Sequence, residues 1–288
     1  MTLPALATRV VPGLCLAAAA ASLAGVAHAQ GDTGHLRGLG RTDVSFSYSM
    51  DLYDEFWVGS TKVSDPTVGE VTREAVNLHV AHGVRDDLDL VFSASWADAE
   101  NDGTSDFDDK SAWQDAVAGV KWRVGPSMRL GYGECSFLLA PSLKVPLSHY
   151  ETNTPTALGD GQLDWRARGI AHYRLDSGFF LSVESGFDYR TEAPANEIPL
   201  NVTLGIPVAA GITVMPFWSQ VSSDGGHDIG QGDYPGLEEE WERIGVAVYA
   251  RLDERFALST GWKQTVDGRN TGDVDGAYWL GLVWKLGS

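Results

Sequence analysis

Charged residues recur at the polar positions of segments that otherwise alternate between apolar and polar side chains. On extended strands such residues share one face, so their charges gather on one surface. The main candidate site consists of Lys121, Lys144, Arg166, Arg168, Glu184, Asp188, Arg243 and Lys263. Fixed charges along a pore select solutes by sign, whereas ion pairs between them fill a narrow interior and stiffen its wall. The pattern therefore predicts either a charged constriction for small anionic or polar solutes or a closed salt-bridge network.

The spacing of the central charges also predicts which of them meet. If the turn at residues 176–178 is tight, antiparallel pairing places Arg166 directly across from Asp188. Arg168 then falls diagonal to both Asp188 and Glu184. Lysines on the two preceding strands add to this group. We therefore predict more cations than acids on this surface and, in a pore, a preference for anions.

Sequence motifs for catalysis and metal binding are missing. There is no His-Glu-x-x-His, no phosphate-binding glycine loop and no Gly-x-Ser-x-Gly. His79 and His82 are three residues apart, which puts them on opposite faces of a strand, so they cannot share a metal ion. Acidic clusters near residues 102–109 and 224–240 match no calcium-loop spacing and are interpreted as solvated surface. We predict no enzyme, no cofactor and no metal site.

The candidate charges must be positioned by β-strands, because the apolar residues repeat with a period of two. Apolar and polar residues alternate over 44–52, 163–175, 179–190 and 198–208. No window of about 19 residues after position 29 is apolar enough for a membrane helix. The chain nevertheless contains 33 Gly, 10 Trp, 10 Phe and 9 Tyr. Half-apolar strands rich in glycine and aromatic residues are typical of membrane β-barrels.

A soluble β-sandwich alternates in the same way, so two further features decide between the folds. Aromatic residues gather near the ends of the apolar faces, as the interfacial girdles of a barrel require: Trp96, Trp122, Trp165, Tyr173, Tyr189, Trp218, Trp262, Tyr278 and Trp284. Short turns near 85–87, 125–128, 176–178, 209–211 and 253–255 alternate with long polar loops near 55–67, 100–110, 150–161, 191–197, 222–240 and 267–274. We predict an all-β, antiparallel transmembrane β-barrel of about 12 strands over residues 30–288, with its long loops outward and its turns in the periplasm.

Residues 1–29 have the composition of a secretory signal peptide. An apolar run over 10–24 ends in Ala27-His28-Ala29, a pattern that signal peptidase cleaves. Cleavage near Ala29 leaves Cys135 as a single cysteine, so no disulfide is expected. Residues 30–41 are expected to be too short and glycine-rich to plug a barrel. The net charge of −18 excludes nucleic acid as a partner.

The last predicted strand indicates where the chain goes after export. Gly276 to Leu286 carries tyrosine, tryptophan and leucine side chains on one face. This strand resembles the C-terminal signal that the barrel-assembly machinery recognises. We predict an outer-membrane location in a Gram-negative cell, with outer-membrane lipid, lipopolysaccharide and the barrel-assembly machinery as partners.

Three stretches carry a family resemblance: Pro141-Ser142-Leu143-Lys144-Val145-Pro146, residues 158–164 (Leu-Gly-Asp-Gly-Gln-Leu-Asp) and residues 185–190 (Ser-Gly-Phe-Asp-Tyr-Arg). They resemble the outer-membrane transporter family named for the MetA pathway of phenol degradation. The resemblance implies a transporter, in some members encoded with the catabolism of aromatic compounds.

We therefore predict a channel or facilitator for small solutes, aromatic or anionic. The first alternative is a closed structural or surface-interaction barrel. The second is a lipid-modifying outer-membrane enzyme that uses His82, the histidine on its lipid face.

Overall fold

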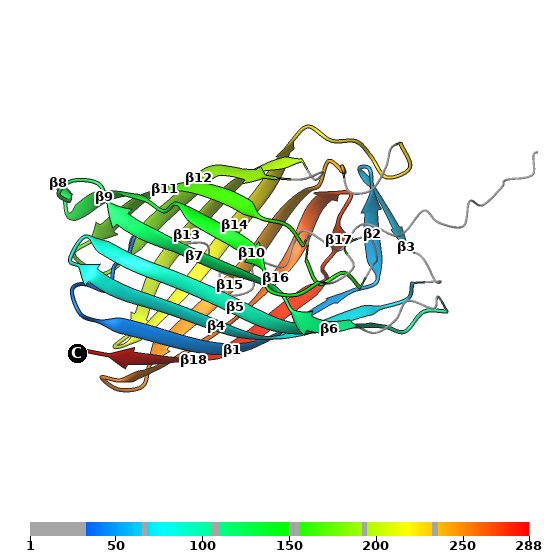
Figure 1. Cartoon of the computed structure of the whole chain (residues 1–288). Coiled ribbons are helices and arrows are strands. Elements are labelled where there is room, and N and C mark those ends of the chain that lie inside the picture. Colours follow the sequence, from blue (N-terminus) through cyan, green and yellow to red (C-terminus); the bar gives the residue numbers. More distant parts are fainter. Residues whose placement is uncertain are drawn as a thin grey trace, which may run out of the picture.

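The computed structural model describes residues 33–64, 68–104, 110–149, 152, 156–159, 161–191, 195–231 and 236–287. They form a closed antiparallel barrel of twelve strands (Figure 1). Ten barrel strands are continuous: β1 (Thr42–Tyr53), β4 (Val71–Arg85), β5 (Leu88–Asn101), β11 (Asp164–Leu175), β12 (Phe180–Arg190), β13 (Asn196–Ala209), β14 (Ile212–Asp224), β15 (Glu240–Arg251), β16 (Phe256–Arg269) and β18 (Gly276–Leu286). The predicted fold class and strand number are confirmed.

The other two barrel strands are each built from two pieces. They are β6 (Lys110–Trp113) with β7 (Asp115–Arg123), and β9 (Gly133–Leu139) with β10 (Ser142–Pro146). The break between β9 and β10 falls at Pro141, which has no N–H to donate to a strand ladder. The connection before β9 contains β8 (Met128–Leu130), which pairs with β9, so it is longer than the tight turn predicted near 125–128.

Closure of the sheet comes from the pairing of the first and last barrel strands. β1 pairs with β18 from Thr42 opposite Leu286 to Leu52 opposite Gly276. In hydrocarbon an open edge would leave backbone N–H and C=O groups without partners, at several kcal/mol each. The C-terminus and β8 lie at one end of the barrel, here called the turn end, and β2, β3 and β17 lie at the other, the loop end (Figure 1).

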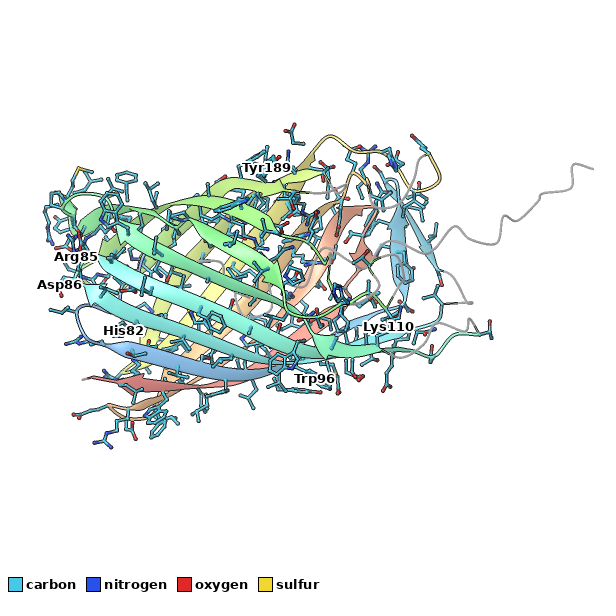
Figure 2. The ribbon with its side chains drawn as sticks, in the orientation of Figure 1. His82, Arg85, Asp86, Trp96, Lys110 and Tyr189 are labelled. Carbon is cyan, nitrogen blue, oxygen red and sulfur yellow. The ribbon has the colours of Figure 1, made fainter. Side chains whose placement is uncertain are left out.

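The outer wall of the barrel is apolar. Trp96 and Tyr189 project from it (Figure 2). On β12 the side chain of Leu181 is 41% exposed, whereas Ser182 faces inward and is 2% exposed. The strand alternation predicted from the sequence therefore separates an outer apolar face from an inner polar one. No helix in the described part of the chain is long and apolar enough to cross a membrane.

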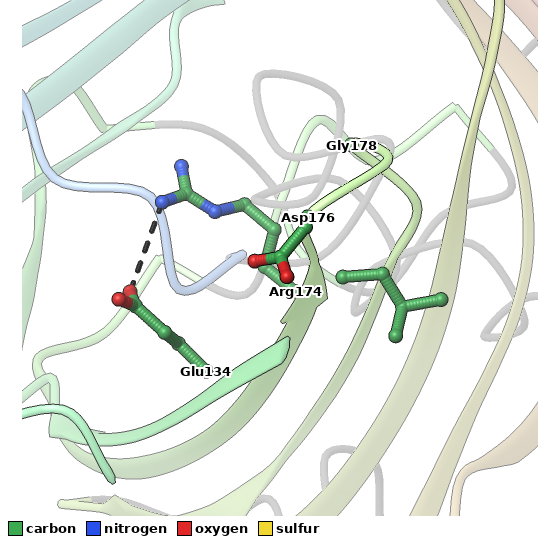
Figure 3. Close-up of a pocket in the computed structure, with 5 residues that line it drawn as sticks. Glu134, Arg174, Asp176 and Gly178 are labelled. Atoms are coloured by element: carbon green, nitrogen blue, oxygen red, sulfur yellow. Dashed lines mark ion pairs between the residues drawn. The ribbon is translucent and has the colours of Figure 1, made fainter. Parts of the chain in front are cut away.

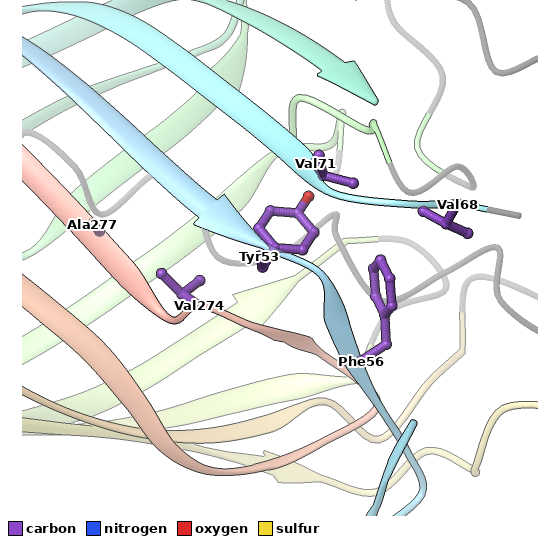
Figure 4. Close-up of a cluster of buried hydrophobic side chains, with 6 residues drawn as sticks. All are labelled: Tyr53, Phe56, Val68, Val71, Val274 and Ala277. Carbon is purple, nitrogen blue, oxygen red and sulfur yellow. The ribbon is translucent and has the colours of Figure 1, made fainter. Parts of the chain in front are cut away.

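Some of the connections at the loop end pack into a small substructure of their own. A small sheet of β2 (Glu55–Val58), β3 (Thr61–Ser64) and β17 (Gly272–Asp273) stands beside the barrel mouth. Beneath it lies a cluster of buried side chains, drawn in Figure 4: Tyr53, Phe56, Val68, Val71, Val274 and Ala277. The long loops predicted from the sequence thus include a compact cap with its own apolar core.

Asn270 ties three of these connections together. It is fully buried and has a φ of 50°, a left-handed conformation that asparagine tolerates better than most residues. Its side-chain oxygen accepts hydrogen bonds from the N–H groups of Gly59 (2.9 Å) and Ile229 (3.1 Å). Its side-chain nitrogen donates to Asp228 Oδ1 at 3.1 Å and to the Glu238 carbonyl at 2.7 Å.

A second connection also turns inward at the loop end. Residues 156–159 are buried, and Leu158 packs against Ala75, Ala97 and Ala99 on the inner faces of β4 and β5. Arg73 donates a hydrogen bond to the carbonyl of Ala157. Part of the predicted 150–161 loop therefore lies inside the barrel mouth.

The segment before β1 enters the barrel from the turn end. Lys121 Nζ donates to the carbonyl of Thr33 at 3.1 Å, and the N–H of Arg37 donates to Asp89 Oδ2 at 3.0 Å. Leu36 packs on the cluster of Leu138, Ala140 and Ile170. Residues 30–41 were expected to be too short to fill the lumen, but the part of this segment from Thr33 to Arg37 enters its turn end and is held by hydrogen bonds to the wall.

Candidate functional site: the charged lumen

All eight candidate residues lie on inward-facing positions of the barrel strands, but they divide into separate groups. One group, the paired wall, lies on β7 and β10 to β13. It comprises the cations Lys144, Arg166, Arg168 and Arg190 and the carboxylates Asp115, Asp164, Glu184, Asp188 and Glu197. Most of these side chains are buried, and each cation has a carboxylate within 4 Å.

The register of the paired wall matches the prediction. Leu175 and Phe179 close the turn through an N–H to carbonyl bond of 2.8 Å, and Arg166 lies opposite Asp188. Arg168 makes a two-pronged contact with Asp188, one prong at 2.6 Å, and approaches Glu184 at 3.5 Å. Fork-to-carboxylate geometry of this kind is among the strongest hydrogen-bonded ion pairs in proteins.

The predicted excess of cations on this wall is not present. Lys144 bonds to Asp164 and lies 3.5 Å from Asp115, and Arg190 lies 2.6 Å from Glu197. With these pairs counted, four cations face five carboxylates. The prediction counted cations strand by strand and left out the acids that neighbouring strands bring within reach.

Lys121 belongs to a different group, because it holds the N-terminal segment. His35 of that segment stacks edge-on against the rings of His172 (4.7 Å) and Phe180 (4.8 Å). Burial, together with the neighbouring His172, lowers the pKa of His35 to about 3. His172 in turn shares a 2.6 Å hydrogen bond with Ser182. His35 is therefore packed against the wall as a neutral imidazole at neutral pH.

Arg243 and Lys263 form a third group, the cationic wall, together with Arg73 and Asp51. These four side chains lie on β15, β16, β4 and β1, on the far side of the barrel from β11 and β12. All are 3 to 6% exposed. Asp51 lies opposite Arg73 in the strand register, and Lys263 is within electrostatic reach of Asp51, Arg243 and Arg73. Three cations here face one carboxylate.

Glu239 lies at the edge of the cationic wall, outside the strands. Burial, together with the nearby charge of Glu197, raises the pKa of Glu239 to about 8. Its Oε1 accepts a hydrogen bond from Thr271 at 3.1 Å. At pH 7 the acid is mostly protonated, so it does not neutralise the cations beside it.

An apolar ledge adjoins the cationic wall on the inner face of the barrel. It consists of Phe180, Met215, Phe217, Ala247 and Trp279, with Tyr249 packed against it. The rings of Phe217 and Trp279 have centroids 6.4 Å apart. The interior of a water-filled barrel is normally polar. These large side chains are turned inward and at most 7% exposed, so they form a packed apolar patch on the inner wall.

A pocket of about 300 Å³ lies at the turn end, outside these groups (Figure 3). Its lining includes Glu134, Arg174 and Asp176, and an ion pair of 3.8 Å joins Arg174 to Glu134. Both of those side chains are about half exposed. An exposed pair is worth little energy and is screened by salt, so this hollow is not a strong candidate site.

Two other predictions concern chemistry rather than transport. His82 lies on the outer side near the turn end and hydrogen-bonds the Thr42 hydroxyl at 2.8 Å (Figure 2). Among the described residues no group of three or more His, Cys, Asp or Glu side chains could hold a metal ion. Several of the predicted acidic-loop residues and the whole signal peptide lie outside the described residues.

The candidates chosen from the sequence did not include several residues of the paired wall and the cationic wall. Asp164 and Arg190 share a strand face with Arg166 and Asp188, so alternation alone could have added them to the candidates. Arg73 could be placed on an inner face but not near Lys263, because two strands separate them in the barrel and nearly the whole chain separates them in sequence.

Comparison with known proteins identifies a family and solved structures with a similar fold. A model of the family described as "Putative MetA-pathway of phenol degradation" matches residues 33–281. The COG4313 outer membrane channel from Pseudomonas putida F1 superposes with a TM-score of 0.71 at 15% identity, over 89% of this chain and 98% of that chain. The KdgM porin superposes with a TM-score of 0.48 at 8% identity, over 83% of this chain and 98% of that chain. At these identities the likeness concerns the fold. No curated protein sequence matches the chain.

Proposed function

The chain belongs to the family described for the MetA pathway of phenol degradation, and we propose that it is an outer-membrane channel for small aromatic or anionic solutes. The observation that carries the proposal is the separation of apolar side chains on the outside of the barrel from charged side chains on the inside. The outer strand faces are apolar, while lysine, arginine and carboxylate side chains are turned into the interior. Such a wall suits a membrane-spanning barrel whose interior selects solutes by charge.

The orientation proposed for the barrel is the usual one for this class, with tight turns in the periplasm and long loops outside. In a Cys135→Ser background, Gly230→Cys in the 222–240 connection should react with an impermeant thiol reagent on intact cells. Ser177→Cys in the tight turn before β12 should react only after the outer membrane is opened. Labelling of Ser177→Cys alone on intact cells would reverse the orientation.

Channel function is tested by single-channel recording in planar bilayers. We expect discrete conductance steps from the purified full-length protein. Arg166→Ala with Arg168→Ala should shift the reversal potential in a salt gradient toward cations, because Asp188 and Glu184 lose the guanidinium groups that hold them. Arg129→Ala with Arg255→Ala removes the same charge from exposed turn-end positions and should leave the reversal potential nearly unchanged.

A closed structural or surface-interaction barrel is the second candidate, because residues 33–37 and 156–159 both enter the barrel. A wild-type protein that folds in bilayers but gives no conductance would establish this alternative and reject the channel. If the Arg166→Ala, Arg168→Ala variant conducts with an unchanged reversal potential, the protein is a channel but these two arginines do not determine its ion selectivity.

A further inference from the structure

The cationic wall and the apolar ledge meet in one row of paired residues on the inner surface. Six residues on six adjacent strands, β14, β15, β16, β18, β1 and β4, form this row: Phe217, Gly245, Lys263, Ala277, Asp51 and Arg73. Because directly paired residues in adjacent strands are neighbours, the row runs without interruption from an aromatic ring to a buried ion cluster.

Two glycines let the aromatic rings approach the lysine. A Cβ on Gly245 would lie 2.4 Å from the ring of Phe217, and one on Gly261 would lie 2.1 Å from the ring of Trp279. Gly245 is paired with Lys263, and Gly261 is the preceding inward position on the same strand as Lys263. The rings therefore lie over the backbone immediately beside the lysine.

The charge at this junction is not balanced within the described residues. Arg243 is 3% exposed, and its Nη2 has no hydrogen-bond acceptor there. Of the acids nearby, Asp51 faces Arg73, Asp273 is ion-paired to Lys62, and Glu239 is mostly protonated at pH 7. Buried charge is costly unless an opposite charge accompanies it. Two positive charges therefore remain for an anion to compensate.

We propose that this junction is a binding site for an amphipathic monoanion, an aromatic carboxylate, and this inference rests on the channel function proposed above. Arg243 and Lys263 receive the carboxylate, since a guanidinium fork matches its two oxygens. Phe217 and Trp279 receive the ring in the offset or edge-on contacts that aromatic groups prefer. The paired wall is not equivalent, because carboxylates of the protein already hold its arginines.

Calorimetric titration of the purified full-length protein in lipid nanodiscs tests the site with three probes. Benzoate carries both the ring and the carboxylate, acetate carries the carboxylate alone, and benzyl alcohol carries the ring alone. We expect benzoate to bind at least about tenfold more tightly than either fragment, because only benzoate engages both parts of the site.

Substitutions test the cationic part and the aromatic part of the proposed site separately. Lys263→Met and Arg243→Gln should each weaken benzoate binding at least about tenfold, as expected for loss of a buried charge-assisted contact. Phe217→Leu should weaken benzoate and leave acetate unchanged. Arg129→Gln is the control, because Arg129 is an exposed cation on β8 at the turn end, paired with Asp176, and this variant should bind benzoate like the wild type.

Folding of each variant is checked by heat-dependent gel mobility, and having two charge variants covers the failure of one to fold. Benzoate binding no tighter than acetate, or unaffected by both charge variants, overturns the proposed site. Benzyl alcohol binding as tightly as benzoate overturns the anion class. Calorimetry requires no current, so a barrel that binds benzoate without conducting refutes the channel alone. A channel that conducts without binding benzoate refutes the site alone.

Discussion

The two charged walls of the lumen use the same residue types and have opposite character. On the paired wall each arginine and lysine lies beside a carboxylate from its own or an adjacent strand, and the charges nearly cancel. On the cationic wall three cations share Asp51. The first arrangement stiffens the barrel, whereas the second leaves charge available to a solute.

The difference arises from where the acids fall along the strands. Each ion pair of the paired wall is formed by residues within one strand or on two adjacent ones, so a few registers determine all of it. Alanine at 277 and glycine at 245 occupy positions of the cationic row where an acid would have neutralised Lys263. The fixed positive charge therefore results from missing partners rather than from added cations.

The largest expected effect on the free energy of unfolding comes from replacing one lysine by methionine, first on the paired wall and then, in a separate variant, on the cationic wall. Lys144→Met removes the cation that the buried Asp115 and Asp164 share, and breaking a buried pair costs about 3–5 kcal/mol. Lys263→Met removes a cation that lacks a partner of its own and should change the free energy of unfolding by less than about 1 kcal/mol, or increase it. Urea unfolding in lipid bilayers measures both. Equal losses would show that the two walls are equivalent.

A smaller effect tests the premise that both walls face inward. Phe46 is 54% exposed on the outer face of β1, and Ser47 follows on the inner face. Phe46→Arg should cost about 2–4 kcal/mol, the price of a cation near the bilayer midplane. Ser47→Arg should cost clearly less, since its guanidinium reaches the lumen. The same unfolding assay decides, and equal costs would contradict the assignment of faces.

The smallest expected effect concerns how protein stability and ion preference change with pH as Glu239 beside the cationic wall ionises. The pKa of Glu239 is raised from its ordinary 4.5 to about 8, so the fold favours the protonated acid. Stability is therefore lost as pH rises from the ordinary carboxyl range through about 8, where the buried carboxylate forms. Ionised Glu239 also offsets one cation, so the anion preference should fall between pH 7 and 9. Glu239→Gln should reduce both changes, as measured by unfolding and by reversal potential at each pH. A variant with the wild-type pH dependence would show that other groups cause it.

Local pattern was enough to predict much of the barrel. Alternation separated Leu181 from Ser182, and the tight turn after Leu175 fixed the register that joins Arg166 to Asp188. Both follow from the two-residue period of a strand and from hairpin geometry, which act between neighbours in sequence.

Relations between distant segments could not be read in this way. Residues 30–41 looked too short to fill the lumen, but Lys121 and Asp89 bind the backbone of Thr33 and Arg37 inside it. Residues 156–159 gave no sign that they turn inward to meet Arg73. These contacts depend on the width of the closed barrel and on which strands face each other across it, and no local pattern encodes either.

The sequence by itself therefore determined the strand faces, the approximate strand number and the hairpin registers, because each depends on residues close together in the chain. The tertiary structure alone decided that Arg73, Asp51 and Lys263 share one row, since only the closure of β1 against β18 brings the two ends of the chain together. The pairings of the consecutive strands β14, β15 and β16 place Lys263 beside the aromatic ledge, and the closure adds Asp51 and Arg73 to the same row.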